Sequence, residues 1–155
     1  MFESLLERVR SPSTGVGLVV DGPNVFREEF DVDLDELRDL GRSEGTLVVS
    51  RLYVNEHATP GLIQAAEARG FEVVVTSGDV DVRLAVDATA LVTSERIGTL
   101  VVVSRDTDFK PVLERARVDG IETLAVAPGT YGRSDALQNA ADRAITLDTS
   151  DETDG

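Results

Sequence analysis

The 155-residue sequence contains no cysteine and only one histidine, His57. Without cysteine, the chain forms neither a disulfide nor a thiolate metal site. A single histidine makes serine-histidine and cysteine-histidine catalysis hard to assemble, and we expect His57 to lie in a surface loop. Any metal ion bound by this protein must therefore be held mainly by oxygen atoms.

Long apolar runs are missing as well. No stretch of the sequence approaches the roughly 18 apolar residues that a membrane-spanning helix requires. The N-terminal segment MFESLLERVR is amphipathic, unlike the basic start and continuous apolar stretch of a signal peptide, and we expect it to form a short helix. The sequence predicts a cytoplasmic protein with no membrane partner and a single domain over residues 1–147.

Lysine is nearly absent, and acidic residues are in large excess. Lys110 is the one lysine among 15 basic residues, and 29 acidic residues give a formal net charge of −14. Such a charge would repel nucleic acid if it marked the binding surface. The acidic residues are instead spread along the whole chain, which favours a halophilic protein from a cytoplasm of very high salt, where charges are screened over a few ångström. The acidic segment at 148–155 has no periodicity and is expected to be a disordered tail.

Apolar runs alternate along the chain with segments of helical period. The predicted strands cover residues 16–21, 46–54, 71–77, 99–104, 121–127 and 144–147. The predicted helices cover residues 33–45, 59–70, 81–94, 108–120 and 134–142. Continuously apolar strands that alternate with helices are typical of a parallel sheet covered on both faces. The sequence therefore predicts an α/β fold, a three-layer α/β/α sandwich with a mainly parallel sheet.

Aspartates follow two of the predicted strands directly. Asp21 ends the apolar run GLVVD, and Asp106 and Asp108 come just after LVVVS. Ligands of parallel sheets bind beyond the carboxyl ends of the strands, at the point where the strand order reverses. If the first and fourth strands are neighbours, all three carboxylates face one crevice.

The helix predicted over 81–94 adds two more carboxylates. Asp81 and Asp87 border its apolar stripe from the two sides, so neither side chain is plainly turned to solvent. Carboxylates that converge at one place raise one another's pKa values, and a bound divalent cation reverses this effect. Oxygen ligands of this kind suit Mg²⁺ or Mn²⁺.

Each of these aspartates also has a purely structural interpretation. Asp108 and Asp81 stand near the starts of helices and would serve as N-caps. Asp87 follows an arginine by four residues, the spacing of an ion pair along a helix. Asp21 and Asn24, in the sequence DGPN, would stabilise a turn, although the apolar run before Asp21 favours a functional role.

Motifs of other phosphate chemistries are missing. The sequence has no Gly-Lys-Ser/Thr P-loop. Gly15 and Gly17 stand at the start of the first predicted strand, whereas a dinucleotide fingerprint would follow that strand. A phosphatase of the haloacid dehalogenase type would need an acid or a threonine two places after Asp21, where Pro23 stands. Ser104 has no base nearby in the sequence that would make it a nucleophile.

Three motifs make the sequence recognisable as a whole. VVDGPNV (19–25), GDVDVRLAVDAT (78–89) and VVSRDTDFKPVL (102–113) occur in this order and are followed by GTYGRSDALQNAADRAI (129–145). Together they closely resemble the NYN domain family, which has the PIN-like nuclease fold, and look most like an uncharacterised, LabA-like archaeal group. The resemblance runs from about Val16 to Leu147.

The resemblance implies a hydrolase, an endoribonuclease that cleaves RNA phosphodiester bonds with the help of Mg²⁺ or Mn²⁺. Mapped onto this sequence, the catalytic and metal-binding residues would be Asp21, Asp81, Asp106 and Asp108, with Asp87 as a further metal ligand. The residues that would contact RNA are Asn24, Ser104 and Arg105.

The sequence departs from the family pattern in two places. Arg105 replaces a small residue of the third motif, as it does in the archaeal group, and Ser77-Gly78-Asp79 stands where many members have a lysine. Arg105 would either contact a substrate phosphate or pair with a neighbouring carboxylate. The alternative function is a non-catalytic RNA- or nucleotide-binding regulatory module, and self-association into a homo-oligomer stays open.

Overall fold

A six-stranded sheet forms the centre of the molecule. The computed structural model describes residues 14–26, 32–129 and 135–147. The strands are β1 (Gly15–Asp21), β2 (Thr46–Asn55), β3 (Glu72–Thr76), β4 (Thr99–Val103), β5 (Glu122–Ala127) and β6 (Arg143–Thr146). All neighbouring strands pair in parallel, in the order β3-β2-β1-β4-β5-β6.

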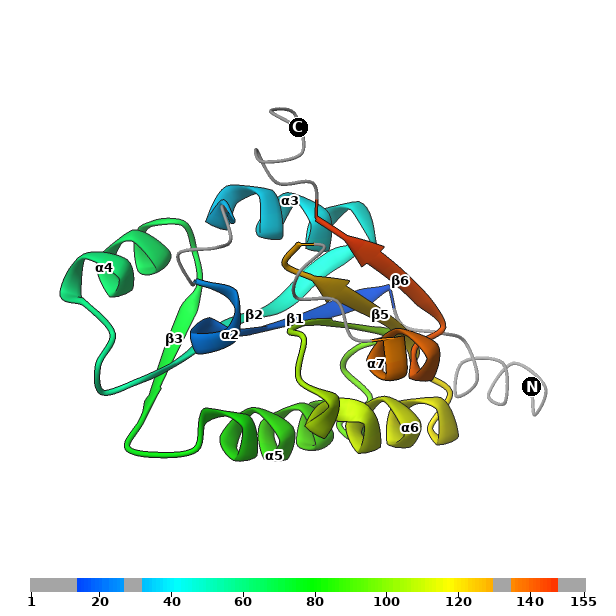
Figure 1. Cartoon of the computed structure of the whole chain (residues 1–155). Helices are drawn as coiled ribbons and strands as arrows, with labels where there is room; N and C mark the ends of the chain where they lie inside the picture. The colour runs from blue at the N-terminus through cyan, green and yellow to red at the C-terminus, as the bar shows by residue number, and fades with distance from the viewer. Residues whose placement is uncertain (1–13, 27–31, 130–134, 148–155) are drawn as a thin grey trace, which may run out of the picture.

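Helices cover both faces of this sheet (Figure 1). One face carries α3 (Leu34–Ser43) and α4 (Pro60–Ala68), and the other carries α5 (Val80–Val92), α6 (Lys110–Val118) and α7 (Asp135–Ala140). This arrangement confirms the predicted three-layer α/β/α sandwich, with a sheet that is parallel throughout its six described strands.

The two central strands are apolar on both sides because helices cover both faces. Every residue of β1 and of β4 is buried. Leu18 and Val20 join the core beneath α3 and α4, whereas Val19 joins the core beneath α5 and α6. This division follows from strand geometry, in which successive side chains point to opposite faces.

The strand order reverses between β1 and β4. From β1 the sheet grows outward through β2 and β3, and the chain then returns to place β4 on the other side of β1. Val20 lies beside Val103, so the carboxyl ends of β1 and β4 lie together. The expectation that these two strands are neighbours is confirmed, and the crevice of a parallel sheet belongs at this point.

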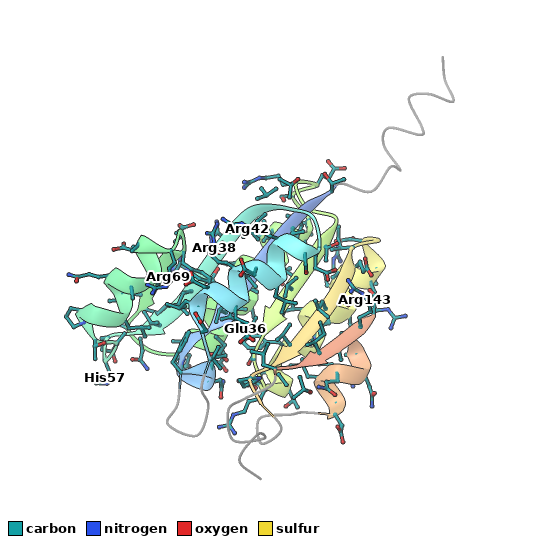
Figure 2. All side chains as sticks on the ribbon, turned by 90° about the horizontal axis from the view of Figure 1, so that it is seen from above. Glu36, Arg38, Arg42, His57, Arg69 and Arg143 are labelled. Carbon is teal, nitrogen blue, oxygen red and sulfur yellow. The ribbon has the colours of Figure 1, made fainter. Side chains whose placement is uncertain are left out.

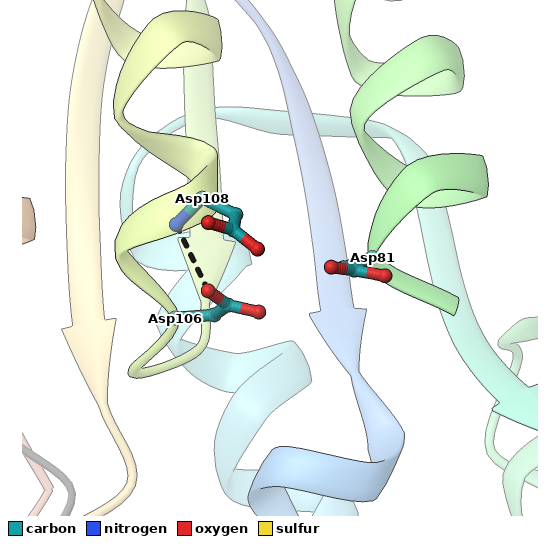
Figure 3. A group of neighbouring side chains, drawn as sticks. All are labelled: Asp81, Asp106 and Asp108. Carbon is teal, nitrogen blue, oxygen red and sulfur yellow. Dashed lines mark hydrogen bonds between the residues drawn. The ribbon is translucent and has the colours of Figure 1, made fainter. Parts of the chain in front are cut away.

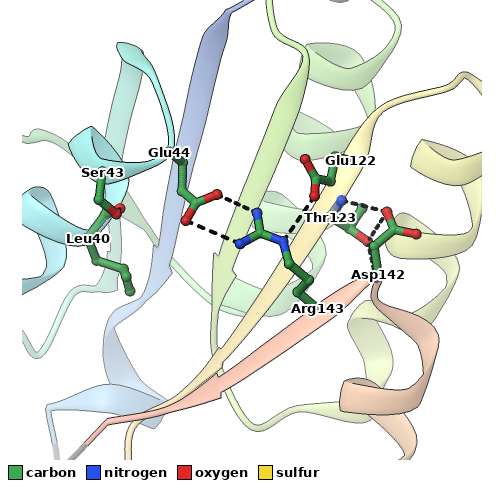
Figure 4. Close-up of polar contacts among 7 residues, drawn as sticks. All are labelled: Leu40, Ser43, Glu44, Glu122, Thr123, Asp142 and Arg143. Carbon is green, nitrogen blue, oxygen red and sulfur yellow. Dashed lines mark hydrogen bonds and ion pairs between the residues drawn. The ribbon is translucent and has the colours of Figure 1, made fainter.

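The last strand is tied to the sheet by polar contacts (Figure 4). Arg143, on β6, pairs with Glu122 on β5 and with Glu44 just after α3. Asp142 accepts hydrogen bonds from the backbone N–H and the hydroxyl of Thr123, at 2.8 and 3.2 Å. The NAAD-Arg ending therefore has a structural role here, since it fixes the outer edge of the sheet.

Several boundaries differ from the expectations. The segment Gly22–Val25 forms a short helix, α2, where the sequence indicated a turn, and the helix predicted from residue 108 begins with a 3₁₀ turn, η1 (Thr107–Phe109). The expected N-terminal helix and the acidic tail at 148–155 lie outside the described residues. Over the part of the chain that the structure describes, no helix combines the length and apolarity needed to cross a bilayer.

Gly22 permits the close approach of α2 to β2. A Cβ atom at this position would lie 2.5 Å from the carbonyl oxygen of Tyr53 and 2.9 Å from the side chain of Val54. We expect Gly22→Ala to lower the free energy of unfolding by about 1–3 kcal/mol, because backbone must move to relieve the overlap. Urea denaturation measures this change.

Gly61 provides the matched control. It lies in α4, and a Cβ atom there would meet no other atom within 4 Å. Gly61→Ala should therefore stabilise the protein by about 0.5–1 kcal/mol, because alanine loses less backbone entropy on folding. Equal effects of the two substitutions would contradict the close approach at Gly22.

Candidate metal centre

Four aspartates gather at the carboxyl ends of β1 and β4. Asp21 is the last residue of β1, Asp106 and Asp108 lie at the start of η1 after β4, and Asp81 lies in the first turn of α5. These segments are distant in the sequence, but β1 pairs with β4 and α5 contacts η1. The topology of the sheet thus brings the aspartates together.

Three of the four form a compact cluster (Figure 3). Asp81, Asp106 and Asp108 each offer one carboxylate oxygen, and these oxygens all lie within 4.8 Å of one another. One oxygen of Asp106 accepts a 2.9 Å hydrogen bond from the backbone N–H of Asp108. Figure 3 shows its other oxygen pointing toward Asp81 across the gap between η1 and α5.

The N-cap interpretations of Asp108 and Asp81 are wrong. Asp106, not Asp108, caps η1, and the residue before α6 is Phe109. The N-cap position of α5 is held by Asp79, while Asp81 accepts a hydrogen bond from the N–H of the next residue. The sequence could not decide which of Asp106 and Asp108 is the cap, because the short 3₁₀ turn that begins there has no periodicity of its own.

The negative charges of the cluster repel one another. The pKa of the exposed Asp108 carboxyl group is raised mainly by the charge of Asp106. Desolvation and Asp81 raise this pKa further. A divalent cation would offset this repulsion. Three carboxylates that converge on one point are also the hard oxygen donors that Mg²⁺ and Mn²⁺ prefer, so the residues present fit such an ion.

Asp21 differs from these three because it is almost completely buried, with 2% of its surface exposed. Its Oδ2 atom accepts hydrogen bonds from the amide of Asn24 at 2.6 Å and from the hydroxyl of Ser104 at 2.9 Å. Burial raises the pKa of Asp21, the two hydrogen bonds lower it, and the nearby charge of Asp106 raises it again, with a net increase. The protein therefore holds a carboxylate here at a cost in stability.

Ser104 connects Asp21 with the cluster. Its hydroxyl donates to Asp21 and accepts a 3.0 Å hydrogen bond from the backbone N–H of Asp106. With 1% of its surface exposed, Ser104 lies behind the carboxylates and not on their open side. In the structure Ser104 positions Asp21 and the backbone of Asp106, and its contact with RNA stays a prediction.

A pocket of about 200 Å³ opens beside the cluster, and its lining includes Asp21, Asn24, Asn55, Asp79, Asp81 and Asp106. The side-chain amide of Asn24 donates a hydrogen bond to Asp21, and its oxygen accepts a 3.3 Å hydrogen bond from Nε of Arg105. Arg105 and Asn24 thus form a polar pair next to the aspartates.

Comparison with known proteins identifies the family. The family model described as NYN domain matches residues 15–148. The chain belongs to the NYN domain family. Membership of this family, together with the aspartate cluster, fits a nuclease.

Two proteins similar to this NYN domain are described as uncharacterised or of unknown function. An uncharacterized protein of Methanocaldococcus jannaschii is 41% identical over 140 residues, which are 90% of this chain and 58% of the relative. The chain therefore spans somewhat more than half the length of that relative. A crystal structure of a protein of unknown function from Vibrio parahaemolyticus has a TM-score of 0.77 at 20% identity, covering 89% of this chain and 95% of its own. That likeness supports the fold.

Asp87 does not join the cluster of the NYN domain. Its Oδ2 atom accepts hydrogen bonds from the hydroxyl of Tyr53 at 2.9 Å and from Nε of Arg83 at 3.1 Å. The expected ion pair with the arginine four residues earlier is therefore present. Asp87 points to a different flank of α5 from Asp81, and we leave it out of the proposed metal site.

Two polar residues that line the pocket were not predicted as site residues from the sequence, Asn55 and Asp79. Asn55 is the last residue of β2, the neighbour of β1, so the rule that pointed to Asp21 would also have found it. Asp79 lies just before α5 within the motif GDVD. His57, by contrast, lies in the loop after β2 with 83% of its side chain exposed, as expected (Figure 2).

Asp21→Asn should leave the metal-free NYN domain as stable as the wild type or more stable, by up to about 2 kcal/mol at neutral pH. A carboxyl group whose pKa is raised by folding stabilises the protein at low pH, and this contribution is lost as the pH rises through the folded pKa. The advantage of the variant should therefore shrink on acidification. Urea denaturation in EDTA at neutral and acidic pH measures it.

The same variant should gain less stability from Mn²⁺ than the wild type does, because Asp21 lines the pocket beside the cluster. Asp39→Asn, an exposed substitution on α3, is the control that changes net charge equally. Equal stabilisation of wild type, Asp21→Asn and Asp39→Asn by Mn²⁺ would rule out a role for Asp21 in binding the ion.

Proposed function

We propose that this NYN domain is a ribonuclease that hydrolyses RNA phosphodiester bonds and depends on Mg²⁺ or Mn²⁺. The observation that carries the proposal is the convergence of Asp81, Asp106 and Asp108 at the switch point of the sheet. These carboxylates come from two separate crossovers and repel one another, so their convergence costs stability and supports a role in binding a cation.

The proposed cation would be held by Asp81, Asp106 and Asp108, with Asp21 beneath them. When bound, such an ion supplies Lewis-acid chemistry, which activates water and offsets the negative charge that develops on the phosphate. The domain itself contributes a fixed arrangement of ligands. Ser104 holds Asp21 and the backbone of Asp106 together, so the carboxylates of β1 and of η1 keep their relative positions.

Arg105 and Asn24 are the residues proposed to orient the RNA. They are joined by a hydrogen bond and lie next to the pocket, where Asn24 is one of the lining residues. A guanidinium group presents a planar fork of donors that matches two phosphate oxygens. In this division of roles the aspartates hold the ion, and Arg105 positions the phosphate beside it.

The decisive experiment measures cleavage of a generic single-stranded RNA by the purified wild-type domain, in KCl at about the molar concentrations expected of a halophilic cytoplasm. We expect cleavage with Mn²⁺ or Mg²⁺ and none in EDTA. Cleavage that persists in EDTA would contradict the metal dependence. If no divalent cation supports cleavage of any RNA, the nuclease proposal fails, and binding of RNA without cleavage would identify a regulatory module.

A further inference from the structure

A second pocket lies on the flank of α5 that faces away from η1. It has a volume of about 310 Å³, larger than the pocket at the aspartates, and lies between α5 and the strands β2 and β3. Its charged lining consists of Arg51, Arg83, Arg96, Glu72 and Asp87. Nothing in the proposed cleavage reaction uses these residues.

This pocket has more positive than negative side chains, whereas the protein as a whole is strongly negative. Three arginines face two carboxylates, whereas the chain as a whole carries a formal net charge of −14. The arginines come from three separate elements, β2, α5 and the segment between α5 and β4. Arginines brought together from separate elements in a concave place are a feature of anion recognition.

Two of the arginines are already held in place. Nε of Arg51 lies 2.9 Å from Glu72, and Nε of Arg83 lies 3.1 Å from Asp87. Both ion pairs are made through Nε, on one side of the guanidinium group. An arginine held in this way loses little further freedom when its remaining donors bind a ligand.

The partial burial of Arg51 and a hydrogen bond from Tyr53 to Asp87 also favour the binding of an anion. The side chain of Arg51 is only 23% exposed, so an anion that pairs with it is partly shielded from water. Tyr53, which is fully buried, donates its hydroxyl to the same oxygen of Asp87 that pairs with Arg83. Burial and the Asp87 carboxylate raise the pKa of Tyr53 far above its usual value, so its hydroxyl stays a donor.

We propose that this pocket binds a phosphate group, carried either by the backbone of an RNA strand or by a free nucleotide. The arginine forks suit phosphate oxygens, and the pocket is too polar to suit an apolar ligand. An RNA source rests on the proposed function. Asp81 lies in the first turn of α5 and the pocket residues follow from Arg83 to Arg96, so a strand cut at the cluster would reach the pocket by running along α5.

The test uses binding in EDTA, where no cation is held and no cleavage occurs. The probes are a short single-stranded RNA and AMP, at the lowest KCl concentration that keeps the domain folded. Calorimetry measures their affinities for two variants of one ion pair, Arg51→Gln and Glu72→Gln. Arg42→Gln and Glu67→Gln are the matched controls, since they make the same charge changes on α3 and α4, across the sheet (Figure 2 shows Arg42).

The two variants should change affinity in opposite directions. Arg51→Gln removes a donor to the phosphate and should weaken binding about tenfold. Glu72→Gln removes a negative charge that repels the phosphate but keeps an oxygen that can accept from Nε of Arg51, and it should strengthen binding about threefold. Both controls should stay within about twofold of the wild type. An effect on RNA alone assigns the site to the RNA backbone, and an effect on AMP as well assigns it to a free nucleotide.

The proposal is overturned if the two variants change affinity in the same direction, if they match their controls, or if neither probe binds. Arg83→Gln, at a half-exposed position, replaces Arg51→Gln if the latter fails to fold. The outcome is independent of cleavage. If the domain binds a probe through Arg51 but never cleaves RNA, the nuclease proposal is rejected and the phosphate site is kept. If the domain cleaves RNA but Arg51→Gln leaves binding unchanged, the phosphate site is rejected and the nuclease proposal is kept.

Discussion

Asp106→Asn should lower the rate of divalent-dependent RNA cleavage by about a hundredfold or more. The substitution keeps the size of the side chain and an oxygen that can accept the hydrogen bond from the Asp108 backbone, so the cap of η1 survives. It removes the charge that the proposed cation needs and that raises the pKa of Asp108. Single-turnover cleavage with saturating enzyme measures the rate.

Mn²⁺ stabilisation of the same variant supplies an independent measurement. The melting temperature of Asp106→Asn should respond much less to Mn²⁺ than that of the wild type. Asp119→Asn is the control, because Asp119 ends α6 on the same side of the sheet and pairs with Arg115 away from the cluster. If Asp106→Asn and Asp119→Asn cleave RNA equally well, the cluster is not the active site.

The melting temperature should rise by on the order of 10 °C as KCl is raised from about 0.1 M to about 2 M. At a formal net charge of −14 the folded chain repels itself, and salt shortens the range of this repulsion. Differential scanning calorimetry measures the change. At a pH near the isoelectric point of about 4.3, where the net charge is close to zero, the same addition of KCl should have a much smaller effect.

A melting temperature that stays flat or falls with KCl would contradict adaptation to high salt. The acidic surface would then need another explanation, such as a basic partner. The pH control separates screening of charge from a general effect of the salt on water, because only screening depends on the net charge of the chain.

The central part of the fold was predictable because strands buried on both faces have continuously apolar sequences. β1 and β4 are continuous apolar runs, and each ends at an aspartate or just before one. In a parallel sheet this pattern is enough to place Asp21 and Asp106 at the same edge. That α5 would bring Asp81 to them followed from its helical period and the resemblance to the NYN family.

The remainder depended on contacts that no local pattern contains. α2 is a helix of four residues whose sequence favours a turn, and it forms because Gly22 can lie against the carbonyl of Tyr53. The helical period placed Asp87 at the border of an apolar stripe. Whether that border faces η1 or β2 is decided by how α5 lies on the sheet, and Tyr53 on β2 binds Asp87.

The hydrogen bond between Ser104 and Asp21 joins residues separated by 83 positions, and it has a consequence for biosynthesis. A nascent chain that has left the ribosome only as far as α5 already contains Asp21 and Asp81, but neither β4 nor Asp106. The carboxylates cannot meet until β4 has inserted beside β1. The growing polypeptide therefore holds no complete cluster until the segment through Asp108 has emerged from the ribosome.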